Sequence, residues 1–280
     1  MLQDLDIGRL ENEFHNIPPR PEDILLCFSK DQVLLHRDGD DFLTLPTLKQ
    51  MQIWQGTGSA QYLFRMQDQN YFLWTDVAPS VPQDGFTYEA ARQLRQLKSS
   101  DICFAVMTGW HLYNWYRTNR LCGCCGTPTE HDSKERMLRC PNCNNMIFPR
   151  ISPAVIVAVT NGDHILLSKY AGRTYTRFAL IAGYTEIGET LEQTVHREVM
   201  EEVGLKVKNL RYYKSQPWGV DGNILMGFYC DVDGNDAIHI DENELSMADW
   251  YPRNALPAHD DGISLTREMI RVFEEGNEPR

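Results

Sequence analysis

The sequence lacks any apolar segment long enough to cross a membrane. Its longest uninterrupted apolar run is Ala154–Val159, far short of the ~20 residues that a spanning helix needs. It also lacks the beginning of a secretory signal, which is basic and then apolar, because Met1–Asp6 is acidic. We therefore expect a cytoplasmic protein that does not enter a membrane.

Positive charge is also scarce. Lys and Arg number 27 against 39 Asp and Glu, which gives a net charge of −12. Such a surface repels polyanions, so the composition argues against a general nucleic-acid coat protein. An acidic enzyme can still take phosphorylated substrates when divalent metal ions lie between its carboxylates and the phosphates.

The length and the order of local patterns predict an α+β chain of several parts. The 280 residues exceed the commonest domain size of about 100–150 residues. Short β-branched and aromatic segments bounded by turn residues fill the first part, and helical spacing follows from about Tyr88 to Asn119. We expect an N-terminal β-rich domain ending in a helix (1–119), a cysteine-rich segment (120–150) and a C-terminal domain (151–280).

Four cysteines have the spacing of a zinc ribbon. Cys122 and Cys125 form one C-x2-C turn, and after fourteen residues Cys140 and Cys143 form another. Two such turns direct four thiolates at one centre and leave no open position for water, so we predict structural zinc. Cys124 lies inside the first turn and is not expected to bind the metal. Zinc ribbons also bind nucleic acid, but six Lys or Arg against three Asp or Glu in Arg117–Arg150 make a weak basic patch.

A second pattern places three carboxylates on one face of a helix. Thr190 and Gln193 form a capping box, and Gly204 can end the helix in a left-handed conformation. Glu198, Glu201 and Glu202 then stand three and four residues apart on one face. Their repulsion would destabilise an ordinary helix, and hard cations such as Mg²⁺ or Mn²⁺ relieve it. We therefore predict a divalent-metal site here.

The residues from Gly183 to Leu205 match G-x5-E-x7-R-E-U-x-E-E-x-G-U, with U apolar, at every fixed position. This pattern resembles the Nudix box. The resemblance implies a Nudix hydrolase, with an α/β/α sandwich that hydrolyses a nucleoside diphosphate linked to another group. It implies that the three glutamates of the helix hold divalent ions, and that Arg197 and Glu189, with Gly183, support the loop.

The ribbon directly before this box resembles the NADH pyrophosphatase family, whose members also remove NAD caps from RNA. Ser215–Trp218 is similar to the start of that family's S-Q-P-W-P-F-P-x-S signature, and Gly219–Asn223 departs from it. The resemblance implies a homodimer that cleaves NADH, NAD or NAD-capped RNA to a nicotinamide mononucleotide and AMP or a 5′-monophosphate RNA.

The same resemblance assigns further roles. Glu244 is a further metal-linked carboxylate, catalytic together with Glu201 and Glu202, and Ala182 offers its carbonyl to a metal. The expected substrate-binding residues are Arg92, Phe148, Tyr184, Gln216, Asn223 and Thr266. Two alternatives stay open: a Nudix pyrophosphatase for ADP-ribose or another dinucleotide, which the altered Gly219–Asn223 favours, and a zinc-ribbon regulator that binds nucleic acid. The complete set of box carboxylates argues against the regulator.

Overall fold

The computed structural model describes residues 3–4, 10–38, 42–51, 60–75, 85–91, 100–172, 177–257 and 263–280. The chain divides into two compact units. The N-terminal unit contains Leu2–Arg150 with Gly219–Gly222, and the C-terminal unit contains Ile151–Trp218 and Asn223–Arg280. Residues 120–150 group with the N-terminal strands, so the division into three domains stays a prediction.

Two small sheets and one long helix build the N-terminal unit. The first sheet has the order β1-β6-β7-β2, and the second has β3-β4-β5 with β8 paired to β4. The elements are β1 (Leu10–Glu11), β2 (Ile24–Leu26), β3 (Phe28–Ser29), β4 (Gln32–Asp38), β5 (Phe42–Thr44), β6 (Ala60–Met66), β7 (Gln69–Trp74), β8 (Phe86–Ala90) and α1 (Ser100–Thr118). Leu25, Leu34, Tyr62 and Phe72 come from both sheets and are buried in one core.

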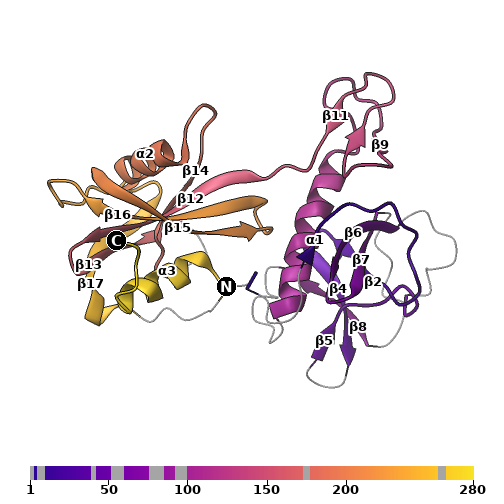
Figure 1. Cartoon of the computed structure of the whole chain (residues 1–280), viewed down its shortest axis with the longest axis horizontal. Helices are drawn as coiled ribbons and strands as arrows, with labels where there is room; N and C mark the ends of the chain where they lie inside the picture. The colour runs from indigo at the N-terminus through magenta and orange to yellow at the C-terminus, as the bar shows by residue number, and fades with distance from the viewer. Residues whose placement is uncertain are drawn as a thin grey trace. The chain divides into compact units, whose positions relative to one another are not determined.

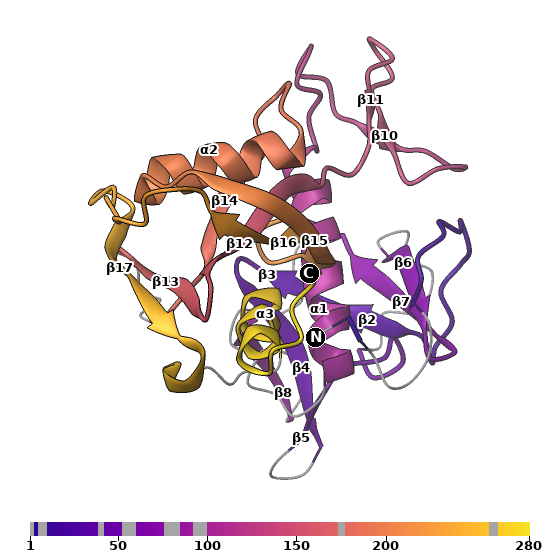
Figure 2. The same cartoon turned by 60° about the vertical axis from the view of Figure 1, so that its left-hand side comes forward.

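Helix α1 lies alongside the strands of this unit (Figures 1 and 2). It packs closely on β2 at Gly109, where a Cβ atom would lie 2.3 Å from Cδ1 of Leu26. The expected start of this helix near Tyr88 is wrong. Tyr88 lies in β8 opposite Leu34 of β4, because a pairing between distant segments overrides the local helical spacing.

The cysteine-rich segment continues from the end of α1 as a three-stranded sheet in the order β11-β10-β9. Its strands are β9 (Glu130–His131), β10 (Leu138–Arg139) and β11 (Met146–Ile147). The Arg136 guanidinium joins it to the rest of the unit by donating to the main-chain oxygens of Asn12 and Leu63.

A mixed sheet between two helices forms the C-terminal unit (Figure 1). Its strand order is β15-β16-β12-β13-β17, with β14 paired to β12. The elements are β12 (Ser152–Asn161), β13 (His164–Tyr170), β14 (Ile181–Tyr184), α2 (Leu191–Val203), β15 (Val207–Trp218), β16 (Asn223–Val232), β17 (Leu245–Pro252), the 3₁₀ helix η2 (Arg253–Ala255) and α3 (Leu265–Glu274). This architecture confirms the α+β fold and the α/β/α sandwich.

The side chains of β12 point alternately to the two faces of the sheet, which explains why a helix covers each face. Val155 and Val157 share one core with Val195 of α2, whereas Ile156 shares the opposite core with Met269 of α3. Neighbouring residues of a strand point to opposite faces, so a nearly continuous apolar strand is buried by a helix on each side. None of the described helices is long and apolar enough to span a bilayer.

Candidate active site

Gly183 of β14 leaves the space that Glu198 of α2 occupies. A Cβ atom at position 183 would lie 1.9 Å from Cδ of Glu198 and about as close to both of its oxygens. Real Cβ atoms do not approach other atoms so closely, so only glycine admits the carboxylate here. The first glycine of the box therefore brings α2 against the edge of β14.

Local signals fix the position of α2. The Thr190 hydroxyl accepts a hydrogen bond from the main-chain N–H of Gln193, and the Gln193 side chain accepts one from the N–H of Thr190. Gly204 ends the helix with φ of 69°, a conformation that glycine adopts without strain. The helix occupies Leu191–Val203, between the expected caps Thr190 and Gly204, so the capping prediction is confirmed.

Arg197 is the centre of the site. Its Nε and Nη2 donate to the two carboxylate oxygens of Glu189 at 2.7 and 2.8 Å. Its Nη1 donates to Glu198 at 2.8 Å and to Glu201 at 3.0 Å, and Nη2 also donates to the carbonyl of Tyr184 at 2.9 Å. A guanidinium has five N–H donors, so these contacts use all of them. The arginine therefore ties the loop to the carboxylate face of α2.

The carboxylates differ in environment. Glu198 and Glu202 are buried, at 9% and 2% exposure, whereas the Glu201 side chain is 59% exposed. Hydrogen bonds from Arg197 lower the pKa of Glu189 to about 2. Burial raises the pKa of Glu198, against the opposing effect of Arg197.

Glu244 belongs to the same electrostatic site, although it lies outside the box. Its negative charge, like that of Glu201, contributes to the raised pKa of Glu198. It is exposed in the turn before β17, and its carbonyl accepts a hydrogen bond from Ala171 at 2.8 Å. Glu198 is thus a carboxylate of α2 that the charge of Glu244 affects.

The four predicted cysteine ligands lie together in the N-terminal unit. Their Sγ atoms all lie within 4.8 Å of one another, and Cys122–Cys143 and Cys125–Cys140 are separated by 3.6 and 3.4 Å. A tetrahedron with Zn–S bonds of ~2.3 Å has edges of ~3.8 Å, so the thiols fit zinc. The N–H groups of Cys124 and Cys143 donate to Sγ of Cys122 and Cys140, respectively.

Comparison with known proteins agrees with both sites. A model of the NUDIX domain matches residues 150–273, and a model of the NADH pyrophosphatase zinc ribbon domain matches residues 117–148. The NAD-capped RNA hydrolase NudC of Photorhabdus laumondii is 37% identical over 179 residues, which are 63% of this chain and 69% of that protein. This chain belongs to the NudC family of Nudix hydrolases. NudC of Klebsiella pneumoniae is 40% identical over 179 residues, with the same two shares.

Among solved structures, a NUDIX hydrolase from Nitrosomonas europaea has a TM-score of 0.49 and 21% identity, covering 56% of this chain and 91% of that one. The sequence relatives and the two family models confirm the resemblance drawn from the box and the ribbon.

Two of the predicted substrate residues meet in the Nudix unit. The Asn223 amide, at the start of β16, donates to the Tyr184 hydroxyl at 3.2 Å. Asn223 is 7% exposed and Tyr184 is 50% exposed. The pair therefore places an aromatic ring at the surface beside the loop that Arg197 holds.

The other predicted site residues lie in varied surroundings. Ala182 lies in β14 opposite Ile156, and Thr266 is half-buried in α3. Gln216 is fully buried, donates to the carbonyl of Ile263 at 2.9 Å and accepts from the N–H of Leu265 at 2.7 Å. It thus links β15 to the start of α3. The substrate roles of Thr266 and Gln216 stay predictions.

Two predicted residues lie outside the Nudix unit as described. Phe148 belongs to the N-terminal unit and is 51% exposed, and Arg92 lies outside the described residues. Their substrate roles also stay predictions.

Thr194 is a residue of the site that sequence reasoning missed. It is fully buried, and its hydroxyl lies 3.1 Å from Glu189 Oε2 and 3.0 Å from the carbonyl of Thr190. The box leaves this position unspecified. The one signal in the sequence is its place four residues after the N-cap, within reach of the carbonyl of Thr190.

Proposed function

We propose that this protein hydrolyses the diphosphate bond of NADH and NAD, giving a nicotinamide mononucleotide and AMP, and that it also removes NAD caps from RNA. The observation that carries the proposal is the convergence of Glu189, Glu198 and Glu201 on Arg197. This arrangement occurs in a chain that also has the ribbon of the NADH pyrophosphatases. The names of the curated relatives support the choice of substrate.

The carboxylates fit divalent metal ions. Glu198 is buried beside Gly183, and its pKa is raised by burial and by the neighbouring negative charges of Glu201 and Glu244. Such concentrated negative charge with oxygen ligands suits Mg²⁺ or Mn²⁺. Glu198, Glu201, Glu202 and Glu244 would hold the ions, with the Ala182 carbonyl as a further ligand. Bound there, the ions would neutralise charge on the diphosphate and lower the pKa of the attacking water.

The chain's own residues provide positioning and proton transfer. Arg197 fixes the carboxylates of Glu198 and Glu201 in one orientation, at 2.8 and 3.0 Å, so little reorganisation is needed when substrate binds. Exposed Glu201 and Glu244 are open to solvent and can accept a proton from water, whereas Glu202 is 2% exposed. This difference in exposure favours Glu201 or Glu244 as general base over Glu202.

The exposed ring of Tyr184 supports recognition of the planar part of the substrate. Aromatic faces stack on nucleobases, and the hydrogen bond from Asn223 fixes the hydroxyl end of this ring. We place the adenine against Tyr184.

A second candidate function is hydrolysis of ADP-ribose or another dinucleotide. It is favoured by Gly219–Asn223, which contains two glycines and no aromatic residue where the NADH pyrophosphatases have Pro-Phe-Pro-x-Ser. The reacting diphosphate is common to both candidates, so the Nudix site serves either one.

Product analysis separates the two candidates. The zinc-containing protein would be incubated with Mg²⁺ or Mn²⁺ and with NADH, NAD, ADP-ribose or NAD-capped RNA, and the products identified by chromatography. We expect nicotinamide mononucleotide and AMP, and 5′-monophosphate RNA, at higher kcat/KM than hydrolysis of ADP-ribose. A reversed preference would favour the second candidate, and no cleavage of any of the four would contradict both.

The family resemblance also supports a homodimer and a cytoplasmic location. Light scattering of the purified protein would test the first, and cell fractionation the second. A monomeric mass at micromolar concentration would contradict the homodimer.

A further inference from the structure

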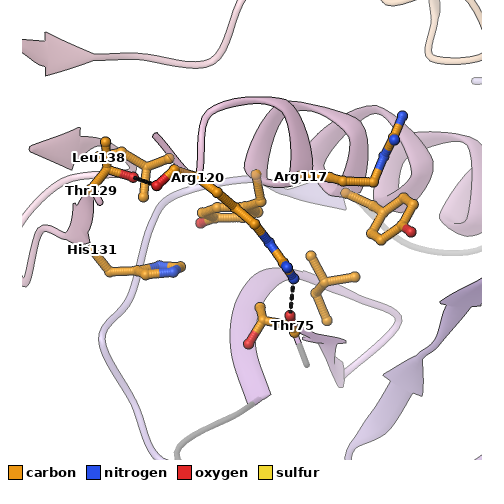
Figure 3. Close-up of a pocket in the computed structure, with 9 residues that line it drawn as sticks. Thr75, Arg117, Arg120, Thr129, His131 and Leu138 are labelled. Atoms are coloured by element: carbon orange, nitrogen blue, oxygen red, sulfur yellow. Dashed lines mark hydrogen bonds between the residues drawn. The ribbon is translucent and has the colours of Figure 1, made fainter. Parts of the chain in front are cut away.

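A pocket of about 290 Å³ lies within the N-terminal unit. Its lining comes from the end of β7, the second half of α1 and the zinc ribbon (Figure 3). Leu73 and Leu138, which are buried at 0% and 2% exposure, form its apolar part. The residues of the Nudix site belong to the other unit, so the diphosphate hydrolysis proposed above gives this pocket no role.

The charge of the pocket is unlike that of the chain. Its lining includes Arg117 and Arg120 and no carboxylate, although the net charge of the protein is −12. Among the described residues, neither arginine forms an ion pair with an acidic side chain. A concave site with uncompensated guanidinium groups attracts anions.

Arg120 is the group best placed to bind an anion. Its side chain extends to Thr75, whose carbonyl accepts a hydrogen bond from Nη2 at 2.9 Å (Figure 3). That bond uses one of the five guanidinium N–H groups and holds the side chain in place. Arg117 points away from Arg120 in the same view, donates to Asn114 at 3.2 Å and adds positive charge at the rim.

Aromatic rings line the same pocket. The His131 ring stacks on Tyr116 with centroids 5.0 Å apart and an interplanar angle of 24°. Tyr113 contributes a third ring to the lining, and this ring is stacked on Phe28 with centroids 5.0 Å apart. A planar base can extend such a stack, and base–aromatic stacking tolerates any base because every base has a π face. Aromatic rings can stack on the base of a nucleotide, and an arginine held in place beside them can bind its phosphate.

We propose that this pocket binds one nucleotide unit, with its phosphate on Arg120 and its base against His131. The volume lies at the lower end of the ~300–1,000 Å³ of ligand pockets, which suits a single nucleotide better than a dinucleotide. The unit can be a free nucleoside monophosphate or one nucleotide of a single-stranded RNA. This proposal does not depend on the proposed function of the Nudix site.

The test is titration calorimetry of the full zinc-containing chain without Mg²⁺ or Mn²⁺, so that the carboxylate site has no ions to bind phosphate. The probes are AMP, inorganic phosphate and a 5′-phosphorylated single-stranded hexaadenylate. We expect Arg120→Gln to weaken binding of AMP or the hexamer about tenfold or more, because a charged hydrogen bond is lost. Arg139→Gln is the matched control, since it removes one positive charge from β10, outside the pocket lining.

Two further variants separate binding from folding. Arg117→Gln leaves the bond to Thr75 intact and is expected to weaken binding only about twofold to threefold, as loss of a screened rim charge does. His131→Ala removes an exposed ring and is expected to weaken the binding of AMP more than the binding of inorganic phosphate. Thermal unfolding of each variant shows whether the unit is still folded.

These measurements decide whether the pocket binds a nucleotide unit and whether that unit is a free nucleotide or part of an RNA strand. Binding of AMP and the hexamer with similar affinity assigns a free nucleotide, and binding of the hexamer alone assigns an RNA strand. The proposal is overturned if neither probe binds at millimolar concentration, or if Arg120→Gln and Arg139→Gln, both folded, weaken binding equally.

Discussion

The carboxylate of Glu198 occupies the space that a side chain at position 183 would need, and Gly183 leaves that space free. A Cβ atom at position 183 would lie 1.9 Å from Cδ of Glu198, so β14 and α2 approach each other only because the glycine has no side chain. This contact sets the position of a predicted metal ligand.

We expect Gly183→Ala to lower kcat/KM by about a hundredfold, the loss that ~1 Å of misplacement causes in an active site. Steady-state kinetics with NADH would measure it, with thermal unfolding as a check of folding. Gly123→Ala is the control, because no atom lies within 4 Å of the position that a Cβ would take there. Unchanged kinetics of Gly183→Ala would show that the contact does not position Glu198.

The carboxylates of α2 are expected to carry catalysis rather than stability. Glu201→Gln and Glu202→Gln should each lower kcat by about two to four orders of magnitude, the range for one positioned acid–base or electrostatic group. Glutamine keeps the shape of the side chain, so the fold is retained. Glu192→Gln, an exposed residue in the first turn of the same helix, should leave kcat unchanged. Turnover near that of the unaltered enzyme in both variants would remove this helix face from the mechanism.

Loss of one thiolate should release zinc. Cys140→Ser leaves three of four ligands, and structural zinc binding contributes to folding free energy. We expect less zinc per chain by elemental analysis and an unfolding midpoint lower by at least about 4 °C, the shift that ~1–2 kcal/mol causes in a domain of this size. Cys124→Ser, a matched change outside the four-thiol cluster, should retain zinc. Absence of zinc from the freshly purified unaltered protein would contradict the assignment.

Acid should weaken a second ion pair of the Nudix unit. Hydrogen bonds from Arg211, at 2.9 and 3.0 Å, lower the pKa of Asp231 from 3.8 to about 2. Because the folded-state pKa is below the unfolded one, this pair stabilises the fold above about pH 3.8 and loses its contribution as the pH falls toward 2.

The difference in unfolding free energy between the unaltered protein and Asp231→Asn should therefore shrink from pH 5 to pH 3. Urea unfolding at both values measures it. Asp233→Asn, whose partner Lys208 is about half exposed, should give a small difference at either pH. A difference for Asp231→Asn that does not change with pH would mean that the carboxylate is not stabilised by its charge.

Local signals explain which parts were predictable. The bounds of α2 followed from Thr190, Gln193 and Gly204, which act within a few residues of each helix end. The strand that contains Tyr88 is not predictable in the same way, because its partner in the sheet, Leu34, is distant in the sequence. The role of Gln216 at the start of α3 could not be read from the chain, since it depends on how β15 and α3 pack.

Thr194 shows the same limit inside the active site. Its hydroxyl lies 3.1 Å from the Glu189 side chain, which also accepts a hydrogen bond from Arg197, seven residues after the N-cap. No pattern of spacing specifies these contacts. Thr194 is therefore expected to be a positioning residue, and it can be tested as one.

Thr194→Val keeps the volume of this buried side chain and removes its donor. Glu189 retains its bonds from Arg197 and from the N–H of Glu186, so we expect a modest fall in kcat/KM, about threefold to tenfold, as for the net ~0.5–1.5 kcal/mol of one typical hydrogen bond. Thr194→Ser should restore activity because it returns the hydroxyl. Thr190→Ala removes the capping bond, at a cost of about 1 kcal/mol of stability, without touching Glu189. If Thr190→Ala lowers kcat/KM as much as Thr194→Val at equal loss of stability, Thr194 acts only through the helix; if only Thr194→Val lowers it, the hydroxyl positions the Glu189–Arg197 pair.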